Sequence, residues 1–222
     1  MSSVPKLQAV IFDYGAVLCH LPTAEQLDEF SSVARLARDE FWTLYLATRA
    51  PYDRGSLDAR GYWKYFGEQA GRKYSDAEIT RLSELDISVW LSMNDAMLEL
   101  AREVRNAGIT TAILSNMPAD LMHVIRREAD WIGLFDKHFF SCEIGVVKPE
   151  PGIYQHVVNS LQVAPQSAML IDDNRDNIAS AKAFGLRALH FESFNALVPK
   201  LAAELDGAGS AVMKLLKRRA KD

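Results

Sequence analysis

The stretch AVIFD, residues 9–13, decides the fold of this chain, because a short and wholly apolar run ends in an aspartate. A second stretch of the same kind, AMLIDD, covers residues 168–173 and ends in two aspartates. Continuous apolar runs of this length are typical of strands buried on both faces of a parallel sheet. Because the carboxyl ends of neighbouring parallel strands meet in one crevice, we expect Asp13, Asp172 and Asp173 to share a ligand site there.

Two further polar motifs lie between these stretches, each at the end of an apolar run. Ser115 and Asn116 follow the run ITTAIL, residues 109–114, and Lys148 follows two valines. Together with the three carboxylates, the hydroxyl and ammonium groups of these motifs can hold a divalent cation and a phosphoryl group.

The composition is that of an ordinary globular protein, and it argues against several classes of function. The 222 residues are 49% hydrophobic and 24% charged, and this length allows one sizeable core with an inserted subdomain. A formal net charge of -4 argues against a general nucleic-acid partner. No apolar stretch reaches the ~20 residues of a membrane helix, and the first residues lack the pattern of a signal peptide. Cys19 and Cys142 are too few and too far apart for a disulfide framework, which favours a cytoplasmic location.

The chain divides into three parts by its hydrophobic pattern. Strand and helix patterns alternate in residues 1–18 and 93–206, which predicts an α/β core: a Rossmann-like, doubly wound parallel sheet with helices on both faces. Residues 19–92 carry helical patterns and almost no strand signal, so we expect an all-helical cap inserted into the core. Residues 207–222 form a basic tail, which we expect to be solvated. The pattern allows a monomer or a homodimer, and nothing in it requires dimerisation.

Local signals set the expected boundaries of the elements. Capping boxes at Thr23 and Ser75 begin two cap helices, the first ending near Arg38, and Asp39 and Asp58 begin two more. One face of the second cap helix is expected to carry Phe41, Trp42, Tyr45 and Leu46. In the core we expect strands at 8–13, 109–114, 138–142, 168–171 and 187–191, and helices at 94–107, 119–127, 151–161, 174–184 and 195–205.

The order of these motifs resembles that of the haloacid dehalogenase superfamily of hydrolases, in the branch with a helical cap. IFDYGAVL (11–18) is similar to the first motif of that family and AILSN (112–116) to its second. GVVKPEPGIY (145–154) resembles the third motif and MLIDDNRDNIASAKAFG (169–185) the fourth. The resemblance covers roughly residues 8–192. Within the family, the Asp-x-Gly-x-Val form of the first motif is similar to that of the α-D-glucose-1-phosphate phosphatases.

The resemblance implies a Mg²⁺-dependent phosphatase in which Asp13 attacks the phosphorus of a phosphomonoester and is itself phosphorylated. Because the substrate and Asp13 both carry negative charge, a bound Mg²⁺ is needed to lower their repulsion. The metal ligands implied are Asp13, Asp173 and the backbone carbonyl of Gly15. Lys148 and Ser115 are the other catalytic residues implied, since they would hold the phosphoryl oxygens of the substrate.

The motifs and the cap also imply supporting positions. Asn116 is a candidate substrate contact, and Asp172 and Asn177 are expected to stand behind the metal ligands and orient them. The polar loop at residues 52–57 is the expected specificity element of the cap. Within it, Arg54 is the candidate contact to a second anionic or hydroxylated group of the substrate.

Gly15 is a departure from the family's phosphatases, which carry a second acid two residues after the nucleophile. That acid protonates the leaving oxygen and later activates water, and its loss typically costs ~10²–10⁴-fold in rate. A substrate with an easily expelled leaving group would avoid this loss, or another side chain would supply the proton. The candidates for that role are His20, Tyr14, Tyr52 and Asp53.

The sequence therefore predicts a phosphatase for a small phosphorylated metabolite, with sugar phosphates the preferred class. Two alternatives stay open. One is a catalytically weak or inactive module that binds phosphate. The other is a 2-haloacid dehalogenase, which Asp172 and Asp173 disfavour because their charges would repel a carboxylate substrate.

Overall fold

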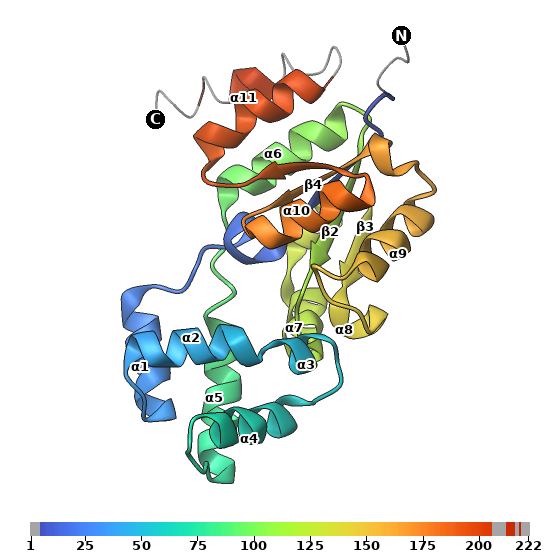
Figure 1. Ribbon diagram of the computed structural model, residues 1–222. Helices are drawn as coiled ribbons and strands as arrows, with labels where there is room; N and C mark the ends of the chain where they lie inside the picture. The colour runs from blue at the N-terminus through green and yellow to red at the C-terminus, as the bar shows by residue number, and fades with distance from the viewer. Residues whose placement is uncertain (1–4, 206–211, 216–217, 219–222) are drawn as a thin grey trace.

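The computed structural model describes residues 5–205, 212–215 and 218, and its centre is a five-stranded parallel sheet (Figure 1). The strands are β1 (Ala9–Phe12), β2 (Thr110–Ser115), β3 (Lys137–Phe140), β4 (Ala168–Asp172) and β5 (Arg187–His190), in the order β3-β2-β1-β4-β5. Phe12 pairs with Ile113 on one side and with Ile171 on the other. The carboxyl ends of β1, β2 and β4 are therefore level at one edge of the sheet.

Helices cover both faces of this sheet. They are α6 (Asp95–Asn106), α7 (Ala119–Glu128), α8 (Ser141–Ile144), α9 (Pro151–Leu161), α10 (Arg175–Phe184) and α11 (Phe194–Glu204), with short helical turns η1 (Tyr14–Leu18), η2 (Asp130–Leu134) and η3 (Pro165–Ser167). Side chains alternate along a strand, so Val10 and Phe12 pack with α6, α7 and α11, whereas Ala9 and Ile11 pack with α9 and α10. This arrangement confirms the predicted Rossmann-like, doubly wound α/β core.

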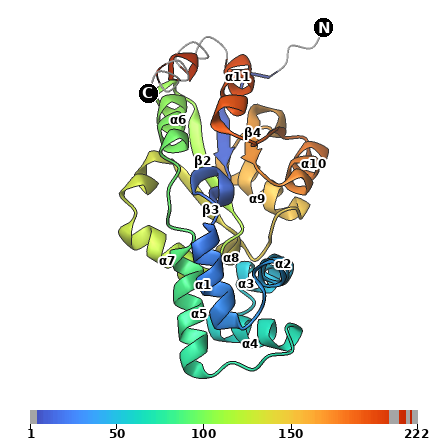
Figure 2. The same ribbon diagram turned by 90° about the vertical axis from the view of Figure 1, so that its left-hand side faces the viewer.

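The residues between β1 and α6 form a separate group of helices beyond the carboxyl edge of the sheet (Figure 1, Figure 2). They are α1 (Ala24–Ala34), α2 (Arg38–Thr48), α3 (Ala50–Asp53), α4 (Ala59–Gln69) and α5 (Asp76–Ser88). Buried aromatic side chains fill the centre of the group, among them Phe30, Phe41, Tyr45, Trp63 and Phe66. Thr23 and Ser75 form the predicted capping boxes, and Asp58 caps α4 as predicted. We refer to these helices as the cap.

Two linkers join the cap to the core and run antiparallel to each other. Cys19 and Met93 face each other in a β-bridge. Backbone hydrogen bonds flank it, from His20 to Ser92 at 2.7 Å and from Asn94 to Leu18 at 2.9 Å. We call this connection, residues 18–20 and 92–94, the linker ribbon.

Three features of the cap differ from the sequence prediction. The first cap helix ends early, because Arg35 adopts a left-handed conformation (φ 57°) and stops α1. The next helix begins at Arg38, with Ala37 rather than Asp39 at its N-cap. Leu46, predicted to share one face of α2 with Phe41 and Tyr45, is 55% exposed, whereas those two side chains are buried. Successive residues of a helix are about 100° apart, so the residue after a fully buried one is carried toward solvent.

The last strand residue of β3 and the tail also differ from expectation. The strand predicted to reach Cys142 ends at Phe140, and the chain then turns into α8. The basic tail predicted at residues 207–222 lies mostly outside the described residues. Val212 and Leu215, which are described, are buried in the same hydrophobic cluster as residues of α6 and α11, so this part is not solvated. The described helices include none with the length and apolar character of a membrane span.

Candidate active site

Three aspartates meet where β1 and β4 end. Asp13 follows β1, and its backbone N–H donates to the carbonyl of Ile171 in β4 at 2.9 Å. Asp172 is the last residue of β4, and Asp173 follows it. One carboxylate oxygen from each aspartate lies within 4.8 Å of the others. Asp13 and Asp172 are buried and Asp173 is exposed, so the cluster opens to solvent on the Asp173 side.

Lys148 lies against this cluster as a buried cation. Its Nζ is 2.8 Å from Asp13 Oδ1 and 2.6 Å from Asp172 Oδ2. The side chain of Asn116 holds the backbone of Lys148, because it accepts the N–H at 2.8 Å and donates to the carbonyl at 2.9 Å. The amide of Asn116, predicted as a substrate contact, is therefore engaged in positioning Lys148.

Burial and mutual charge determine the protonation of these groups. Burial raises the pKa of Asp13 well above its usual value, Asp172 adds to the rise, and Lys148 partly opposes it. Burial acts to lower the pKa of Lys148, but the charges of Asp13 and Asp172 raise it above its usual value. Lys148 is therefore a lasting ammonium group. Lys148 pairs with Asp13 and Asp172, and Asp173 is a third carboxyl group beside them, so the cluster has room for a second cation.

The donor atoms of the cluster fit Mg²⁺. All are carboxylate oxygens, and Mg²⁺ is usually held by one or two carboxylates with water and substrate oxygens completing its shell. Asp172 is the least available of the three, because Oδ2 accepts from Lys148 and Oδ1 accepts from Asn177 Nδ2 at 3.0 Å. This leaves Asp13 and Asp173 as the carboxylates that are free to bind a metal ion. Asn177 donates to Asp172, so it orients that carboxylate and is not itself in the position of a metal ligand.

Ser115 and Gly15 line the space above the cluster. The Ser115 hydroxyl makes one long hydrogen bond, of 3.4 Å to the carbonyl of Asn116, so it can turn toward a ligand. Gly15 has φ −62° and ψ 136°, which any residue can adopt. A Cβ atom there would meet Trp90 at 3.5 Å, an ordinary contact distance. Neither the backbone nor the space at Gly15 therefore forbids a side chain.

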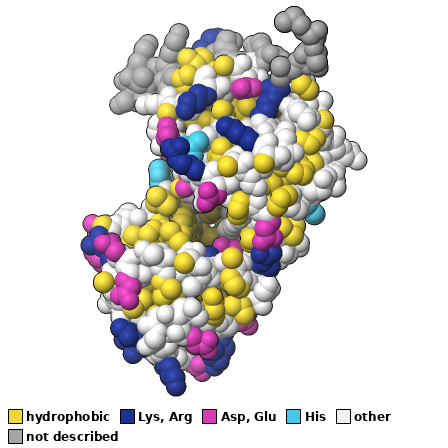
Figure 3. All heavy atoms as spheres, viewed as in Figure 1, with side chains coloured by type: hydrophobic (Ala, Val, Ile, Leu, Met, Phe, Trp, Pro, Cys, Tyr) yellow, Lys and Arg dark blue, Asp and Glu magenta, His cyan; other side chains and the backbone are white. Residues whose placement is uncertain are grey.

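Two cavities extend from this floor toward the cap. Their volumes are about 380 and 360 Å³, and their linings share Gly15, Leu46, Trp90, Ser115, Asn116, Lys148 and Asn174. The larger cavity adds Arg49 and Asp53 of the cap, and the smaller adds Asp13 and Asp173. Figure 3 shows the hollow between the two lobes of the molecule, with hydrophobic side chains gathered at its margin. Both the cap and the core therefore form the walls above the aspartates.

The sequence from residue 7 to residue 185 matches the family described as haloacid dehalogenase-like hydrolase. The chain belongs to the haloacid dehalogenase-like hydrolases. The matched range includes every residue of the cluster, from Asp13 to Asn177, and the whole cap. The predicted membership is confirmed, and the protein is a hydrolase.

Individual relatives of this hydrolase include one phosphatase and several solved structures. The sesquiterpene phosphatase astK of Aspergillus oryzae is 26% identical over 185 residues, which are 82% of this chain and 89% of that protein. A HAD family enzyme from Bacteroides thetaiotaomicron, solved with magnesium and inorganic phosphate, matches with a TM-score of 0.66 at 19% identity, over 83% of this chain and 93% of that one. The L-2-haloacid dehalogenase of Xanthobacter autotrophicus matches with a TM-score of 0.65 at 21% identity, over 88% and 82%. These two structural likenesses show the shared fold.

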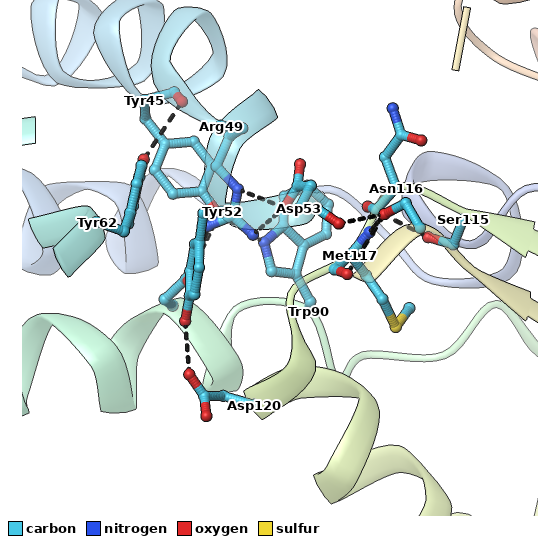
Figure 4. Close-up of polar contacts among 12 residues, drawn as sticks. Tyr45, Arg49, Tyr52, Asp53, Tyr62, Trp90, Ser115, Asn116, Met117 and Asp120 are labelled. Atoms are coloured by element: carbon cyan, nitrogen blue, oxygen red, sulfur yellow. Dashed lines mark hydrogen bonds and ion pairs between the residues drawn. The ribbon is translucent and has the colours of Figure 1, made fainter. Parts of the chain in front are cut away.

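The cap of this hydrolase contains a buried cation that the sequence analysis missed. Arg49 donates from Nη1 to both carboxylate oxygens of Asp86 at 2.8 Å. It also donates from Nε to Asp53 Oδ1 at 3.1 Å (Figure 4). Its guanidinium also lies 4.8 Å from the ring centroid of Tyr45 and 4.9 Å from that of Tyr52. Burial raises the pKa of Asp53 to about 6, and Arg49 partly opposes the rise. The cavity wall thus holds a carboxyl group whose pKa is raised by burial although it is paired with Arg49.

The segment at residues 50–55, which we call the cap anchor, fastens the cap to the core. Tyr52 donates its hydroxyl to Asp120 Oδ2 at 2.9 Å. Ser141 donates its hydroxyl to the backbone carbonyl of Asp53. Both contacts join α3 to core elements beside the cavity, so the cap is held closed over the floor.

Arg54 and His20, two residues singled out from the sequence, do not line either cavity. Arg54 pairs with Glu150 at the start of α9, with Nη1 3.0 Å from Oε2, and so belongs to the cap anchor. We expected the guanidinium of Arg54 to contact the substrate, but in the structure it is paired with the carboxylate of Glu150. His20 is exposed on the linker ribbon. Tyr14 and Asp53, by contrast, both line the larger cavity.

Proposed function

We propose that this hydrolase is a Mg²⁺-dependent phosphatase that cleaves a small phosphomonoester through a phosphorylated Asp13. The observation that carries the proposal is the setting of Asp13. Its carboxylate lines a cavity, lies 2.8 Å from the ammonium group of Lys148, and comes within 4.8 Å of the Asp173 carboxylate. A phosphate dianion can approach a carboxylate only when positive charge compensates the repulsion. The proposed metal ligands are Asp13, Asp173 and the carbonyl of Gly15.

In the first step, a carboxylate oxygen of Asp13 forms a bond to phosphorus while the bond from phosphorus to the leaving oxygen breaks. Lys148 and the hydroxyl of Ser115 donate hydrogen bonds to the phosphoryl oxygens, where negative charge develops. Bound Mg²⁺ would supply further positive charge at these oxygens. Water then attacks the phosphorus of phospho-Asp13, which releases inorganic phosphate and restores the carboxylate.

The leaving oxygen needs a proton, and Gly15 cannot supply one. Burial raises the pKa of Tyr14 far above its usual value, so its hydroxyl does not give up its proton readily. Tyr52 and His20 lie outside both cavity linings. Asp53 lines the larger cavity, and with a pKa of about 6 it is partly protonated near neutral pH. A general acid works best when its pKa is close to the working pH. We therefore assign the role of proton donor to Asp53.

The proposed substrate is a small phosphorylated metabolite. The Asp-x-Gly-x-Val motif favours a sugar phosphate, and the likeness to a sesquiterpene phosphatase supports a phosphomonoester. The charges of Asp172 and Asp173 argue against the carboxylate substrate of a haloacid dehalogenase. Cys19 and Cys142 are free thiols, which supports a reducing compartment such as the cytoplasm. We propose that the enzyme acts as a monomer or a homodimer and needs neither nucleic acid nor a membrane.

Hydrolysis of p-nitrophenyl phosphate tests this proposal, because its leaving group needs little help from an acid. We expect turnover with Mg²⁺, no turnover after chelation with EDTA, and no turnover by Asp13→Asn. Asp39→Asn changes an exposed acid of the cap in the same way and should keep the activity. Turnover by purified Asp13→Asn would exclude Asp13 as the nucleophile. Mg²⁺-dependent binding of phosphate without turnover of any phosphomonoester would favour the inactive binding module instead.

A further inference from the structure

The walls above the aspartate cluster carry several large apolar side chains, whereas the floor is charged. Leu46 and Trp90 line both cavities, Leu21 and Trp42 line the smaller one, and Leu121 lines the larger one. A ligand that placed a phosphate on the floor would therefore place the group attached to it against leucine and tryptophan side chains. The site has one polar end and one apolar end.

Two of these apolar side chains are unusually exposed. Among the described residues, the exposed large hydrophobic side chains are Leu21 at 57%, Leu46 at 55% and Leu91 at 42%. The two most exposed of them line the smaller cavity. Hydrophobic side chains on the near face gather at the margin of the hollow in Figure 3. Contact with an apolar ligand would remove this surface from water, which favours binding.

The hydroxyl and guanidinium groups on the cap side of the cavity already have partners, and the carboxyl group of Asp53 is the one that we assign to the leaving oxygen. The hydroxyl of Tyr45 donates to Asp86 and accepts from Trp90 Nε1 at 2.9 Å. The hydroxyl of Tyr14 donates to the carbonyl of Trp90 at 2.6 Å, and Arg49 is paired with both Asp86 and Asp53. A sugar bound here would lose water from its hydroxyl groups and find few free groups to replace it, which is unfavourable.

We propose that the apolar end binds the alcohol part of the substrate, and that this part is a hydrocarbon chain of several carbons without hydroxyl groups. This inference rests on the proposed phosphatase function, because it assigns a chemical class to the leaving group of that reaction. It places hydrocarbon phosphates ahead of the sugar phosphates that the first motif favours. Leu46, Trp42 and Trp90 are the specificity-determining residues that it names.

Binding of non-hydrolysable alkylphosphonates, from methyl to octyl, tests the inference without requiring turnover. Titration calorimetry with Mg²⁺ should show the affinity rising about twofold to fourfold per methylene until the chain fills the cavity, as burial of hydrocarbon predicts. A polyhydroxylated phosphonate of six carbons should bind more weakly than hexylphosphonate. An affinity that stays constant along the series, or tighter binding of the polyhydroxylated compound, would overturn the inference.

Substitution of the exposed leucines distinguishes binding of the alkyl chain in this cavity from nonspecific hydrophobic binding elsewhere on the surface. Leu46→Ser should lower the ratio of octylphosphonate affinity to methylphosphonate affinity by about fivefold to tenfold, since one apolar wall is lost. Leu91→Ser makes the same change at an exposed leucine outside the two linings, and the ratio should not change. An equal fall in both variants, or in neither, would contradict the assignment of Leu46.

The two proposals fail in distinguishable ways. If chain length increases affinity but octyl phosphate and p-nitrophenyl phosphate are not hydrolysed, the apolar site stands and the phosphatase function is wrong. If p-nitrophenyl phosphate is hydrolysed through Asp13 but the affinity for alkylphosphonates does not depend on chain length, the phosphatase function stands and the inference about the leaving group is wrong.

Discussion

Lys148 and Asp172 form a buried ion pair in which Nζ lies 2.6 Å from Oδ2 and neither side chain is more than 1% exposed. Asn177 donates to both oxygens of Asp172, at 3.0 and 3.1 Å, and so fixes the carboxylate from behind. The pair in turn holds the ammonium group 2.8 Å from Asp13. Asp172 therefore serves to place Lys148, and Lys148 is the group that faces the proposed nucleophile.

Replacement of Lys148 tests this arrangement. Lys148→Met leaves two buried carboxylates without their cation, and breaking a buried pair in this way typically costs about 3–5 kcal/mol. We expect the free energy of unfolding, measured in urea at pH 7, to fall by that order. We also expect kcat to fall at least ~10²-fold, because a donor to the phosphoryl oxygens is lost. Lys182→Met, at an exposed lysine, should change neither quantity.

Metal binding should appear as a gain in stability that depends on Asp173. Asp173 is exposed as a residue, but partial loss of water around its carboxyl group and the neighbouring charge of Asp172 raise its pKa, so its negative charge is unfavourable in the metal-free protein. Mg²⁺ at about 100 times its Kd should stabilise the fold by about 2.7 kcal/mol. Asp173→Asn should lose this stabilisation, without a loss of stability in EDTA, when Tm is measured with and without Mg²⁺. The exposed Asp176→Asn should keep the Mg²⁺ effect, and a loss in both variants would place the metal elsewhere.

Gly15→Asp should increase activity on alkyl phosphates more than on aryl phosphates. The backbone at Gly15 accepts a side chain, and the nearest obstacle to a Cβ is Trp90 at 3.5 Å. A general acid typically contributes ~10²–10⁴-fold, mostly for leaving groups that are hard to expel. The ratio of kcat/KM for the two substrates measures the effect, and Gly15→Ala controls for the added bulk. Equal gains on both substrates would show that a missing proton does not limit the reaction.

Asp53 should make stability depend on pH in the acidic range. Its pKa rises from 3.8 to about 6 on folding, so the folded protein binds this proton more tightly than the unfolded chain. The contribution is therefore fully present below pH ~4 and is lost as pH rises toward 6, by about 3 kcal/mol in total. Asp53→Asn cannot titrate, and its free energy of unfolding should lack this decline. Urea unfolding at pH 4, 5, 6 and 7 measures the difference, and parallel curves for the two proteins would contradict it.

The fold was largely predictable from the sequence because its signals are local. A buried parallel strand must be apolar along its whole length, so residues 9–13 and 168–173 revealed both the sheet and the edge where the aspartates meet. Helix starts could also be predicted, because the side chains of Thr23 and Ser75 accept a hydrogen bond from the backbone N–H only three residues later. The short-range pattern erred at Arg35, where a left-handed residue ended a helix whose apolar pattern continued.

The cap half of the site could not be predicted, because its partners are distant in the sequence. Arg49 is paired with Asp86, which lies 37 residues further along the chain, and the hydrophobic periodicity of α2 and α3 does not indicate that contact. Arg54 was predicted to meet substrate, but Glu150 lies 96 residues away and takes the guanidinium. Leu46 was predicted to share one helix face with Phe41 and Tyr45, but those two are buried, and the exposure of Leu46 is what makes it a candidate for ligand contact. Charge and exposure at a domain boundary depend on how the two parts meet.

The linker ribbon ties the two connections between cap and core together beside the active site. Because residues 18–20 and 92–94 are hydrogen-bonded to each other, neither crossing can flex without carrying the other along. If the cap opens, we expect it to move as one body about this ribbon, once the contacts of Tyr52 with Asp120 and of Arg54 with Glu150 are broken. Entry of a bulky ligand and escape of its products would then be timed by the same hinge, which lies only five residues from Asp13.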